Sequence, residues 1–412
     1  MKPSIFLAGA FDRFNFGDLL FPLITRQAFE RLGIEANFEV LASRWSDLKE
    51  AGALPTAPLG KLSQHPPGPG DTLLLAGGEI LDARWSGTLA ALTSPRRAFG
   101  LKVLAKGFPA MADALSQRAL TGAILGTRRP LPWVLGKEDF ASPMGIAYNG
   151  VGGSGIDGLP PKLQEALRRR LDRAAFLSVR DPRTLEILNR WNLHCPIHLA
   201  PDPAALMAEI FPRPHLEDQQ SQETRDLRAG YEENGYGVVQ LGYYAARGAG
   251  PAVAEQLIRL QRVSGLNLVL VPLGQAAGHE DQRALAALQK RLVGLPVTLA
   301  SATTIIDILS LIAGSRLFAG TSLHGNLTAL AYGVPRVGLG PGIRKLDLFL
   351  RTWDSQQPSG CASFDDFADR ALEALEKPLD LWQRDGERIV REGWKNFENL
   401  AATLQWPSRQ PP

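Results

Sequence analysis

The chain contains very little cysteine and no long uninterrupted hydrophobic segment. Only two of its 412 residues are cysteine, Cys195 and Cys361, which excludes a disulfide-rich scaffold and suggests a reducing compartment. These thiols and the six histidines lack the spacing of a zinc site, so we expect no metal ion. No apolar run approaches the roughly 20 residues of a membrane span, and the apolar start at residues 5–10 is too short for a secretory signal. We therefore expect a cytoplasmic protein.

The sequence also has no long segment in which charges of one sign are concentrated. The chain has 45 Lys and Arg against 42 Asp and Glu, a net charge of +3, and we expect no nucleic-acid partner because no basic stripe occurs. The short cluster at residues 168–170 is expected on the solvated face of a helix. The slight positive excess fits anionic small molecules or an acidic membrane surface, so peripheral contact with the inner membrane stays open. The oligomeric state cannot be predicted.

Strand-like and helix-like segments alternate along the chain, with one break. Apolar runs typical of buried parallel strands precede turns in the first half, at residues 5–10, 72–76, 145–151 and 175–179. A polar, proline-containing stretch at residues 211–231 is interpreted as a linker. Strand-like segments then resume, each separated by a helical one, at residues 237–241, 267–271, 297–299, 316–319 and 336–338. This alternation predicts an α/β protein with two doubly wound, Rossmann-like domains.

The length and the break define the expected domains. We assign residues 1–210 to an N-terminal α/β domain and residues 232–375 to a C-terminal one. Residues 83–143 are less regular and are interpreted as an inserted helical subdomain or lid. Residues 376–412 are expected to form a helix that braces the first domain. A ligand cleft is predicted between the two domains.

The most informative turn is Gly320-Thr321-Ser322-Leu323-His324-Gly325-Asn326. An apolar run leads into it, a helical pattern follows, and Gly333 stops that pattern. His324 is therefore placed where a strand hands over to a helix, at a helix N-terminus that favours an anion. The alternative is structural: Ser322 caps the helix and His324 is an ordinary first-turn residue.

Six short motifs between residues 15 and 349 occur in the order in which they occur in the polysaccharide pyruvyl transferase family, and with them the chain resembles that family. The motifs are Asn15-Phe16-Gly17-Asp18, Leu75-Ala76-Gly77-Gly78-Glu79, Ser178-Val179-Arg180-Asp181, Pro201-Asp202-Pro203-Ala204, Ser322-Leu323-His324-Gly325 with Gly333-Val334-Pro335, and Lys345 with Phe349. Two departures are visible: Glu79 stands where a third glycine is frequent, and Leu323 where some members carry arginine.

The resemblance implies a function and an architecture. Members look like two-domain, GT-B-type glycosyltransferases whose donor is phosphoenolpyruvate, a co-substrate, with no further cofactor. They form a pyruvate ketal on two sugar hydroxyls and release phosphate. The acceptor would be a sugar or a lipid-linked glycan precursor of a polysaccharide, such as an exopolysaccharide.

The resemblance also suggests roles for individual residues. On the donor side, Arg180 and Lys345 would clamp the anion, with Arg344 as a substitute for Lys345, while His324, in the turn with Ser322, contacts phosphate or acts as general acid. The acceptor-side loop would comprise Asn15, Gly17, Gly77 and Gly78. Asp18 would serve either as general base or only through helix capping and the dipole.

Simpler interpretations remain for these residues. Arg180-Asp181 could be a surface pair at a helix end, and Lys345 could be solvated. At the level of the whole protein, the alternatives are a GT-B glycosyltransferase that uses a nucleotide sugar and a catalytically inactive relative that binds glycans or anions.

Overall fold

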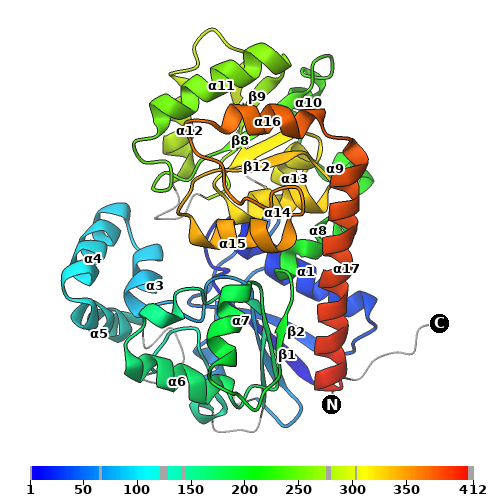
Figure 1. Ribbon diagram of the computed structural model, residues 1–412. Helices are drawn as coiled ribbons and strands as arrows, with labels where there is room; N and C mark the ends of the chain where they lie inside the picture. Colours follow the sequence, from blue (N-terminus) through cyan, green and yellow to red (C-terminus); the bar gives the residue numbers. More distant parts are fainter. Residues whose placement is uncertain are drawn as a thin grey trace.

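Two parallel β-sheets, each covered by helices, form two lobes stacked one above the other (Figure 1). The computed structural model describes residues 2–64, 67–120, 129–140, 144–274, 280–301 and 304–406. The predicted α/β class with two doubly wound domains is confirmed.

The N-terminal sheet has seven parallel strands in the order β3-β2-β1-β4-β5-β6-β7. The strands are β1 Ser4–Ala8, β2 Asn37–Ala42, β3 Ala57–Pro58, β4 Thr72–Ala76, β5 Gly145–Val151, β6 Phe176–Val179 and β7 Ile197–Leu199. All five residues of β4 are buried, which explains its continuous apolar sequence. The order of winding reverses between the neighbours β1 and β4.

The C-terminal sheet repeats this winding with five parallel strands in the order β10-β9-β8-β11-β12. The strands are β8 Tyr236–Gln240, β9 Asn267–Leu270, β10 Val297–Leu299, β11 Leu317–Gly320 and β12 Arg336–Gly338. Here the reversal lies between β8 and β11. In open α/β sheets, ligands bind outside the carboxyl ends of the strands at such a reversal.

Helices cover both sheets and connect the lobes. Those of the first lobe are α1 Phe16–Arg31, α2 Lys61–Gln64, α3 Trp85–Ala91, α4 Pro95–Gly107, α5 Pro109–Leu120, α6 Pro161–Leu171 and α7 Pro182–Asn189, with short 3₁₀ turns η1 Lys49–Ala51, η2 Lys137–Asp139, η3 Ile156–Gly158 and η4 Pro203–Leu206. The others are α8 Met207–Ile210, α9 Arg213–Gln219, α10 Gln222–Ala229, α11 Gly250–Ser264, α12 Asp281–Gln289, α13 Ile305–Ala313, α14 Leu323–Ala331, α15 Arg344–Trp353, α16 Phe367–Glu376 and α17 Leu379–Leu404.

Residues 211–231, interpreted as a linker, lie between the last strand of the first sheet and the first strand of the second, and they form the helices α9 and α10. Leu216 is buried, and the Arg213 guanidinium donates to the carbonyls of Ala313 and Tyr332. Ser221 caps α10 by accepting from the Thr224 N–H. The polar composition reflects two short helices with solvated outer faces.

The last helix, α17, runs along both lobes (Figure 1). Its Phe397 ring packs against Phe29 of α1 at a centroid distance of 5.9 Å. The Asn396 amide donates to Asn149 Oδ1 at the end of β5. Beyond the helix, the Trp406 indole N–H bonds to Thr72 Oγ1 at 3.2 Å. These contacts tie the chain's C-terminal part to the first sheet.

The insertion within residues 83–143 is helical over α3, α4 and α5, and its residues 121–128 and 141–143 lie outside the described part of the chain. An ion pair between Arg84 and Asp113 joins the start of α3 to α5. The buried Trp85 indole donates to the Arg129 carbonyl at 3.0 Å. These two contacts join parts of the insertion to one another, and the Tyr148 hydroxyl of β5 ties the insertion to the first sheet by donating to the Leu135 carbonyl at 2.6 Å.

Candidate active site

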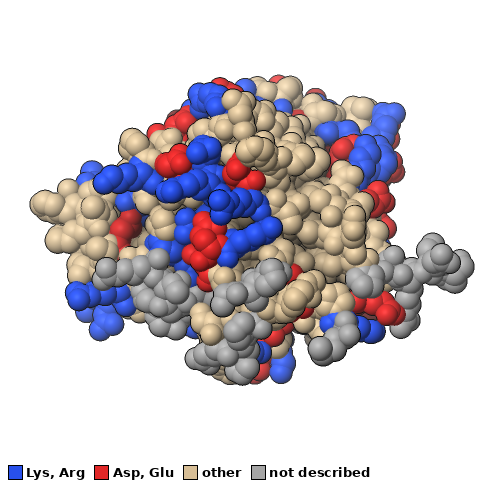
Figure 2. Space-filling view, turned by 90° about the horizontal axis from the view of Figure 1, so that it is seen from below, with Lys and Arg blue, Asp and Glu red and all other residues tan. Residues whose placement is uncertain are grey.

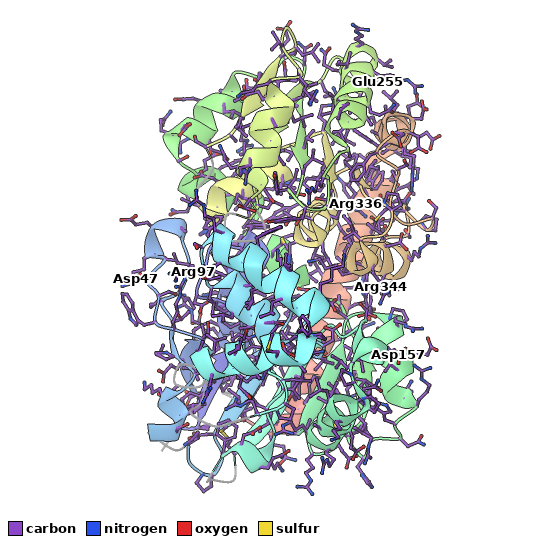
Figure 3. All side chains as sticks on the ribbon, turned by 90° about the vertical axis from the view of Figure 1, so that its left-hand side faces the viewer. Asp47, Arg97, Asp157, Glu255, Arg336 and Arg344 are labelled. Atoms are coloured by element: carbon purple, nitrogen blue, oxygen red, sulfur yellow. The ribbon has the colours of Figure 1, made fainter. Side chains whose placement is uncertain are left out.

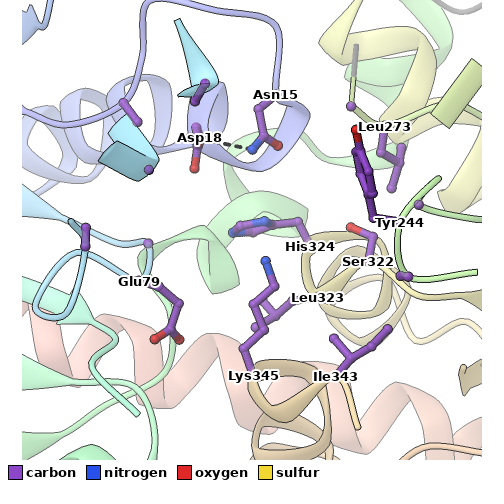
Figure 4. A pocket seen from close by; sticks show the side chains of 18 of the residues that line it. Asn15, Asp18, Glu79, Tyr244, Leu273, Ser322, Leu323, His324, Ile343 and Lys345 are labelled. Atoms are coloured by element: carbon purple, nitrogen blue, oxygen red, sulfur yellow. Dashed lines mark hydrogen bonds between the residues drawn. The ribbon is translucent and has the colours of Figure 1, made fainter. Parts of the chain in front are cut away.

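The two reversal points face each other across a cavity of about 450 Å³. The cavity is lined from the first lobe by residues that follow β1 and β4, and from the second lobe by residues that follow β8 and β11. One wall comes from α3 of the insertion, through Gly87, Thr88 and Ala91, and another from the start of α15. Figure 4 shows Asp18, Glu79, His324 and Lys345 around this space.

The N-terminus of α1 reaches the cavity with Asn15 and Asp18. Asn15 is the N-cap residue, with an extended backbone, and its side-chain amide donates to Asp18 Oδ2 at 2.9 Å (Figure 4). The Phe16 N–H donates to the Leu273 carbonyl of the other lobe at 3.0 Å. Asp18 lies three residues after the cap, so the capping role considered for it is wrong. Its interaction with the helix dipole remains.

Gly17 provides the space that His324 occupies. A β-carbon at position 17 would overlap the imidazole atoms of His324. Gly17 lies in the first turn of α1 and is not among the described glycines with positive φ. Gly17, which was assigned to the acceptor-side loop, thus belongs to a helix, and the structure uses its small size rather than its backbone freedom.

His324 lies in the first turn of α14. Its Nε2 is 3.6 Å from Asp202 Oδ2, and its ring contacts the edge of Phe21 at a centroid distance of 5.5 Å. Within the described residues, Nε2 is buried and makes no hydrogen bond. Ser322 caps α14 by accepting from the Gly325 N–H at 3.2 Å. The capping interpretation of Ser322 is correct, and the cap fixes the turn that presents His324.

The glycines of the second loop, Gly77 and Gly78, both have left-handed backbones, with φ of +59° and +73°. A β-carbon on Gly77 would also overlap the Phe21 ring, which in turn contacts His324. Of the two, Gly78 lines the cavity. This loop therefore turns sharply enough to bring Glu79 to the cavity and leaves room for Phe21.

Arg180, directly after β6, is buried between two carboxylates. Its guanidinium donates to Asp202 Oδ2 at 2.7 Å and to Glu79 Oε1 at 2.9 Å. Burial disfavours its charge, but Glu79 and Asp202 outweigh that effect and raise the pKa of Arg180. Asp181 caps α7 by accepting from the Thr184 N–H at 2.8 Å. The surface-pair interpretation is therefore wrong, and the proposed clamp on the donor stays a prediction.

Asp202 joins the two lobes electrostatically. It is completely buried, accepts from the Ala204 N–H at 3.1 Å, and lies between Arg180 of its own lobe and His324 of the other. Burial raises the pKa of Asp202, but His324 and Arg180 more than compensate and hold it below its usual range. The carboxylate therefore lies within ion-pairing distance of both cationic side chains.

Lys345 extends from the first turn of α15 into the cavity, between Glu79 and His324 (Figure 4). Among the described residues it has no ion pair or hydrogen bond. Surrounding protein and the Arg180 charge lower the pKa of Lys345, although solvent reaches the side chain through the open cavity. Arg344 instead donates to the Ser154 carbonyl of the first lobe at 3.2 Å and does not line the cavity. The structure thus gives no support to Arg344 as a substitute.

The helix that carries Lys345 is fixed to the opposite lobe. The Trp353 indole N–H of α15 donates to the Arg180 carbonyl at 2.8 Å. Together with the Arg344 bond to Ser154, this holds both ends of α15 against the first lobe. The position of Lys345 therefore depends on the packing of the two lobes.

Sequence reasoning missed several residues of the site. Asp202 and Glu79 were recognised only as parts of motifs. Gln240 was not singled out, although its side-chain oxygen accepts from the Ser322 N–H at 2.9 Å and its amide donates to Asp281 Oδ2 at 2.8 Å. Burial raises the pKa of Asp281 to about 6. The one available signal was position, since Gln240 lies next to the carboxyl end of the strand predicted at residues 237–241.

Within the described residues, no group of three or more His, Cys, Asp or Glu side chains is arranged to hold a metal ion. The expectation that the reaction needs no metal stays a prediction.

Comparisons with known proteins agree with the sequence resemblance. The family model described as polysaccharide pyruvyl transferase matches residues 139–342, which confirms that resemblance. A search of curated proteins gave no match.

Solved structures share the fold. The S. aureus MnaA–UDP co-structure has a TM-score of 0.59 at 12% identity, covering 100% of this chain and 99% of that one. The structure of UDP-GlcNAc 2-epimerase from Methanocaldococcus jannaschii has a TM-score of 0.52 at 14% identity, and the match covers 95% of this chain and 99% of that one. UDP-GlcNAc 2-epimerase from Neisseria meningitidis bound to UDP-GlcNAc has a TM-score of 0.53 at 9% identity, and the match covers 98% of this chain and 100% of that one. At such identities the likeness establishes a GT-B-like fold alone.

Proposed function

We propose that this protein, whose residues 139–342 match the family model of the polysaccharide pyruvyl transferases, is a transferase that moves a pyruvyl group from phosphoenolpyruvate to two hydroxyls of a sugar acceptor. The observation that carries the proposal is the cationic lining of the interlobe cavity. Lys345 and His324 lie there beside the N-terminus of α14, with the N-terminus of α1 opposite.

This lining suits a small dianion. Phosphoenolpyruvate carries a carboxylate and a phosphate, and both helix N-termini present N–H groups and a positive dipole end. Because Lys345 has no carboxylate partner among the described residues, its charge is available to a ligand. We assign to Lys345 the main ionic contact with the donor, in a cavity where surrounding protein strengthens electrostatic interactions.

Arg180 can contact the donor once the Glu79 side chain has moved away from it. The Glu79 side chain is 26% exposed, whereas that of Asp202 is fully buried, so Glu79 is the partner of Arg180 that can swing aside. A donor oxyanion would then replace the Glu79 carboxylate on the guanidinium. This exchange reconciles the buried ion pair of Arg180 with a contact to the donor.

The chemistry requires two additions at carbon 2 of phosphoenolpyruvate. One sugar hydroxyl adds to carbon 2 while carbon 3 accepts a proton and becomes a methyl group. The second hydroxyl then attacks carbon 2, the bond from carbon 2 to the phosphate oxygen breaks, and phosphate leaves with the second hydroxyl's proton. His324, held beside the Asp202 carboxylate, donates the proton to carbon 3 as an imidazolium. Asp18 accepts the proton of the first hydroxyl.

The acceptor would enter from the first lobe, past Asn15, Gly78 and the α3 wall. This side of the cavity carries Asp18, whose carboxylate accepts one hydrogen bond in the described structure, from Asn15. A carboxylate with remaining acceptor capacity, facing the cavity, is suited to take a hydroxyl proton.

The donor is tested first by binding. Calorimetric titration with phosphoenolpyruvate, inorganic phosphate and UDP-GlcNAc, together with thermal unfolding, should show binding of phosphoenolpyruvate. A ligand at 100 times its Kd adds about 2.7 kcal/mol of stability. Lys345→Gln should weaken binding at least about tenfold, because it removes a charge-assisted contact. Lys290→Gln, a change of an exposed lysine on α12's C-terminal side, is the matched control and should bind normally.

Turnover is tested second. Phosphate release with sugar and lipid-linked acceptors, and a new ketal methyl signal by NMR, should appear and should persist with a chelator. Arg180→Ala and His324→Ala should each lose about tenfold or more in donor affinity or rate, and Arg180→Lys should also be poor. Binding of UDP-GlcNAc without phosphoenolpyruvate would favour a nucleotide-sugar glycosyltransferase. Phosphoenolpyruvate binding without turnover on any acceptor would favour an inactive relative.

A further inference from the structure

Large apolar side chains are exposed together on α4 and α5. Of the eleven large hydrophobic residues exposed in the described part of the chain, five lie on this hairpin. Phe99 is 63% and Phe108 is 65% exposed, and the others are Val103, Met111 and Leu115. A concentration of this kind marks an interaction surface, since scattered single apolar residues are the normal case.

The spacing of these residues puts them on outward faces of the two helices. Phe99 and Val103 are four residues apart on α4, and Phe108, Met111 and Leu115 follow at helical intervals along the start and body of α5. The other side of α5 is already packed, because Ala112, Ser116 and Leu120 are buried. The outward apolar stripe therefore has no packing role in the described structure.

Basic residues surround this stripe. Helix α4 carries Arg96, Arg97, Lys102 and Lys106 and no acidic residue. All four are exposed, and none of them has an ion pair among the described residues. The one carboxylate of α5, Asp113, is turned to Arg84 and to the Ser86 N–H. Figure 3 looks onto this hairpin, where Arg97 is labelled.

The other basic region of the molecule is different. Figure 2 shows Lys and Arg side chains gathered on the underside of the first lobe, with Asp and Glu side chains among them. Arg183 of α7 and the following Arg190 pair with Asp157, and Arg168 of α6 pairs with Glu165. These arginines are thus paired with carboxylates of the same chain, whereas the four basic residues of α4 have no ion pair among the described residues.

We propose that the α4–α5 hairpin is a docking surface for an anionic lipid bilayer. An apolar stripe flanked by Lys and Arg is what an interfacial helix needs, because the apolar side chains enter the headgroup region while the cations contact acidic headgroups. A second copy of this chain fits less well, since a two-fold contact would oppose the unpaired positive charges of the two α4 helices. No helix of the described residues could span a membrane, so the contact is peripheral.

Docking through this hairpin would place the active cavity near the membrane surface. Helix α3, which packs against α4 and α5, forms one wall of the cavity. On the opposite wall, the Lys102 ammonium lies 4.3 Å from the centre of the Tyr244 ring, which also lines the cavity. A lipid-linked glycan could then reach the site without leaving the bilayer, a consequence that rests on the proposed function.

The docking surface is tested by vesicle co-sedimentation of the full chain. The probes are vesicles of phosphatidylcholine alone and of equal parts phosphatidylcholine and phosphatidylglycerol. The wild type should bind the anionic vesicles, and added salt should weaken that binding. Phe99→Ser with Phe108→Ser should reduce the partition coefficient at least about tenfold. Arg96→Gln with Arg97→Gln should reduce it about fivefold per residue on anionic vesicles.

The matched control is Val263→Ser with Val293→Ser, which removes two exposed apolar side chains elsewhere and should bind like the wild type. Equal vesicle binding by all four proteins, or no binding by the wild type, overturns the proposal. Self-association in analytical ultracentrifugation that the Phe99/Phe108 variant abolishes would overturn it in favour of a dimer interface. Phosphoenolpyruvate titration without lipid should give the same Kd in every variant, so failure of donor binding is seen separately.

Discussion

Gly17→Ala tests whether the first lobe positions the histidine of the second. The added methyl group would overlap the His324 imidazole, at a separation that real side chains do not show. The ring must therefore rotate away, which moves Nε2 from its place 3.6 Å from Asp202. Overpacking of this kind costs about 1–3 kcal/mol, while alanine in place of glycine within a helix returns about 1 kcal/mol. The free energy of unfolding should therefore change little or fall by up to about 2 kcal/mol.

The loss should instead appear in donor binding. A displaced His324 forfeits a charge-assisted contact of about 1.5–3 kcal/mol, so the Kd for phosphoenolpyruvate should rise about tenfold to about a hundredfold. Urea unfolding and calorimetric titration measure the two effects separately. Gly100→Ala is the matched control, because a β-carbon on this α4 glycine meets nothing within 4 Å. Unchanged affinity in Gly17→Ala, with His324→Ala clearly impaired, would refute the positioning argument.

Four further substitutions separate the roles of the charged groups. In the wild type, donor affinity should fall as the pH rises through the pKa of Lys345, because only the ammonium binds the anion, and this pKa lies below its usual 10.5. Lys345→Gln should abolish this alkaline decline of affinity. The same decline in the variant would contradict the role of Lys345. Glu79→Gln should tighten donor binding measured by calorimetry, because it removes the carboxylate that competes with the donor for Arg180. Weaker binding would count against the replacement of Glu79 by the donor. Asp202→Asn should cost about 3–5 kcal/mol in urea unfolding at neutral pH. Because the folded-state pKa of Asp202 is lowered, this contribution is present above about pH 4 and is lost as the pH falls further, so the deficit should shrink in acid; a deficit independent of pH would refute the ionic origin. Asp18→Asn should leave the urea midpoint unchanged but reduce turnover, and full turnover would exclude the base role.

Much of the fold could be predicted because its signals are local. The strands β4, β5, β10 and β12 have the bounds that their apolar runs predicted. Three strands were not predicted for a physical reason: β2 contains exposed or half-buried positions such as Glu39, β3 has two residues, and β7 is a short, partly exposed edge strand. The helices α9 and α10 within the expected linker were not predicted, because short solvated helices and irregular linkers share a polar composition.

The sequence by itself determined where the strands end, which of those ends carry polar turns, and that His324 begins a helix, because these features depend on neighbours in the chain. Only the tertiary structure decided which turns meet. The contact of Gly17 with His324, and the bridge of Asp202 between Arg180 and His324, arise from the packing of two lobes. The tertiary structure also determines that Arg180 pairs with carboxylates and that Lys345 has no ion pair among the described residues, because ion pairs form between residues that are distant in sequence and close in space.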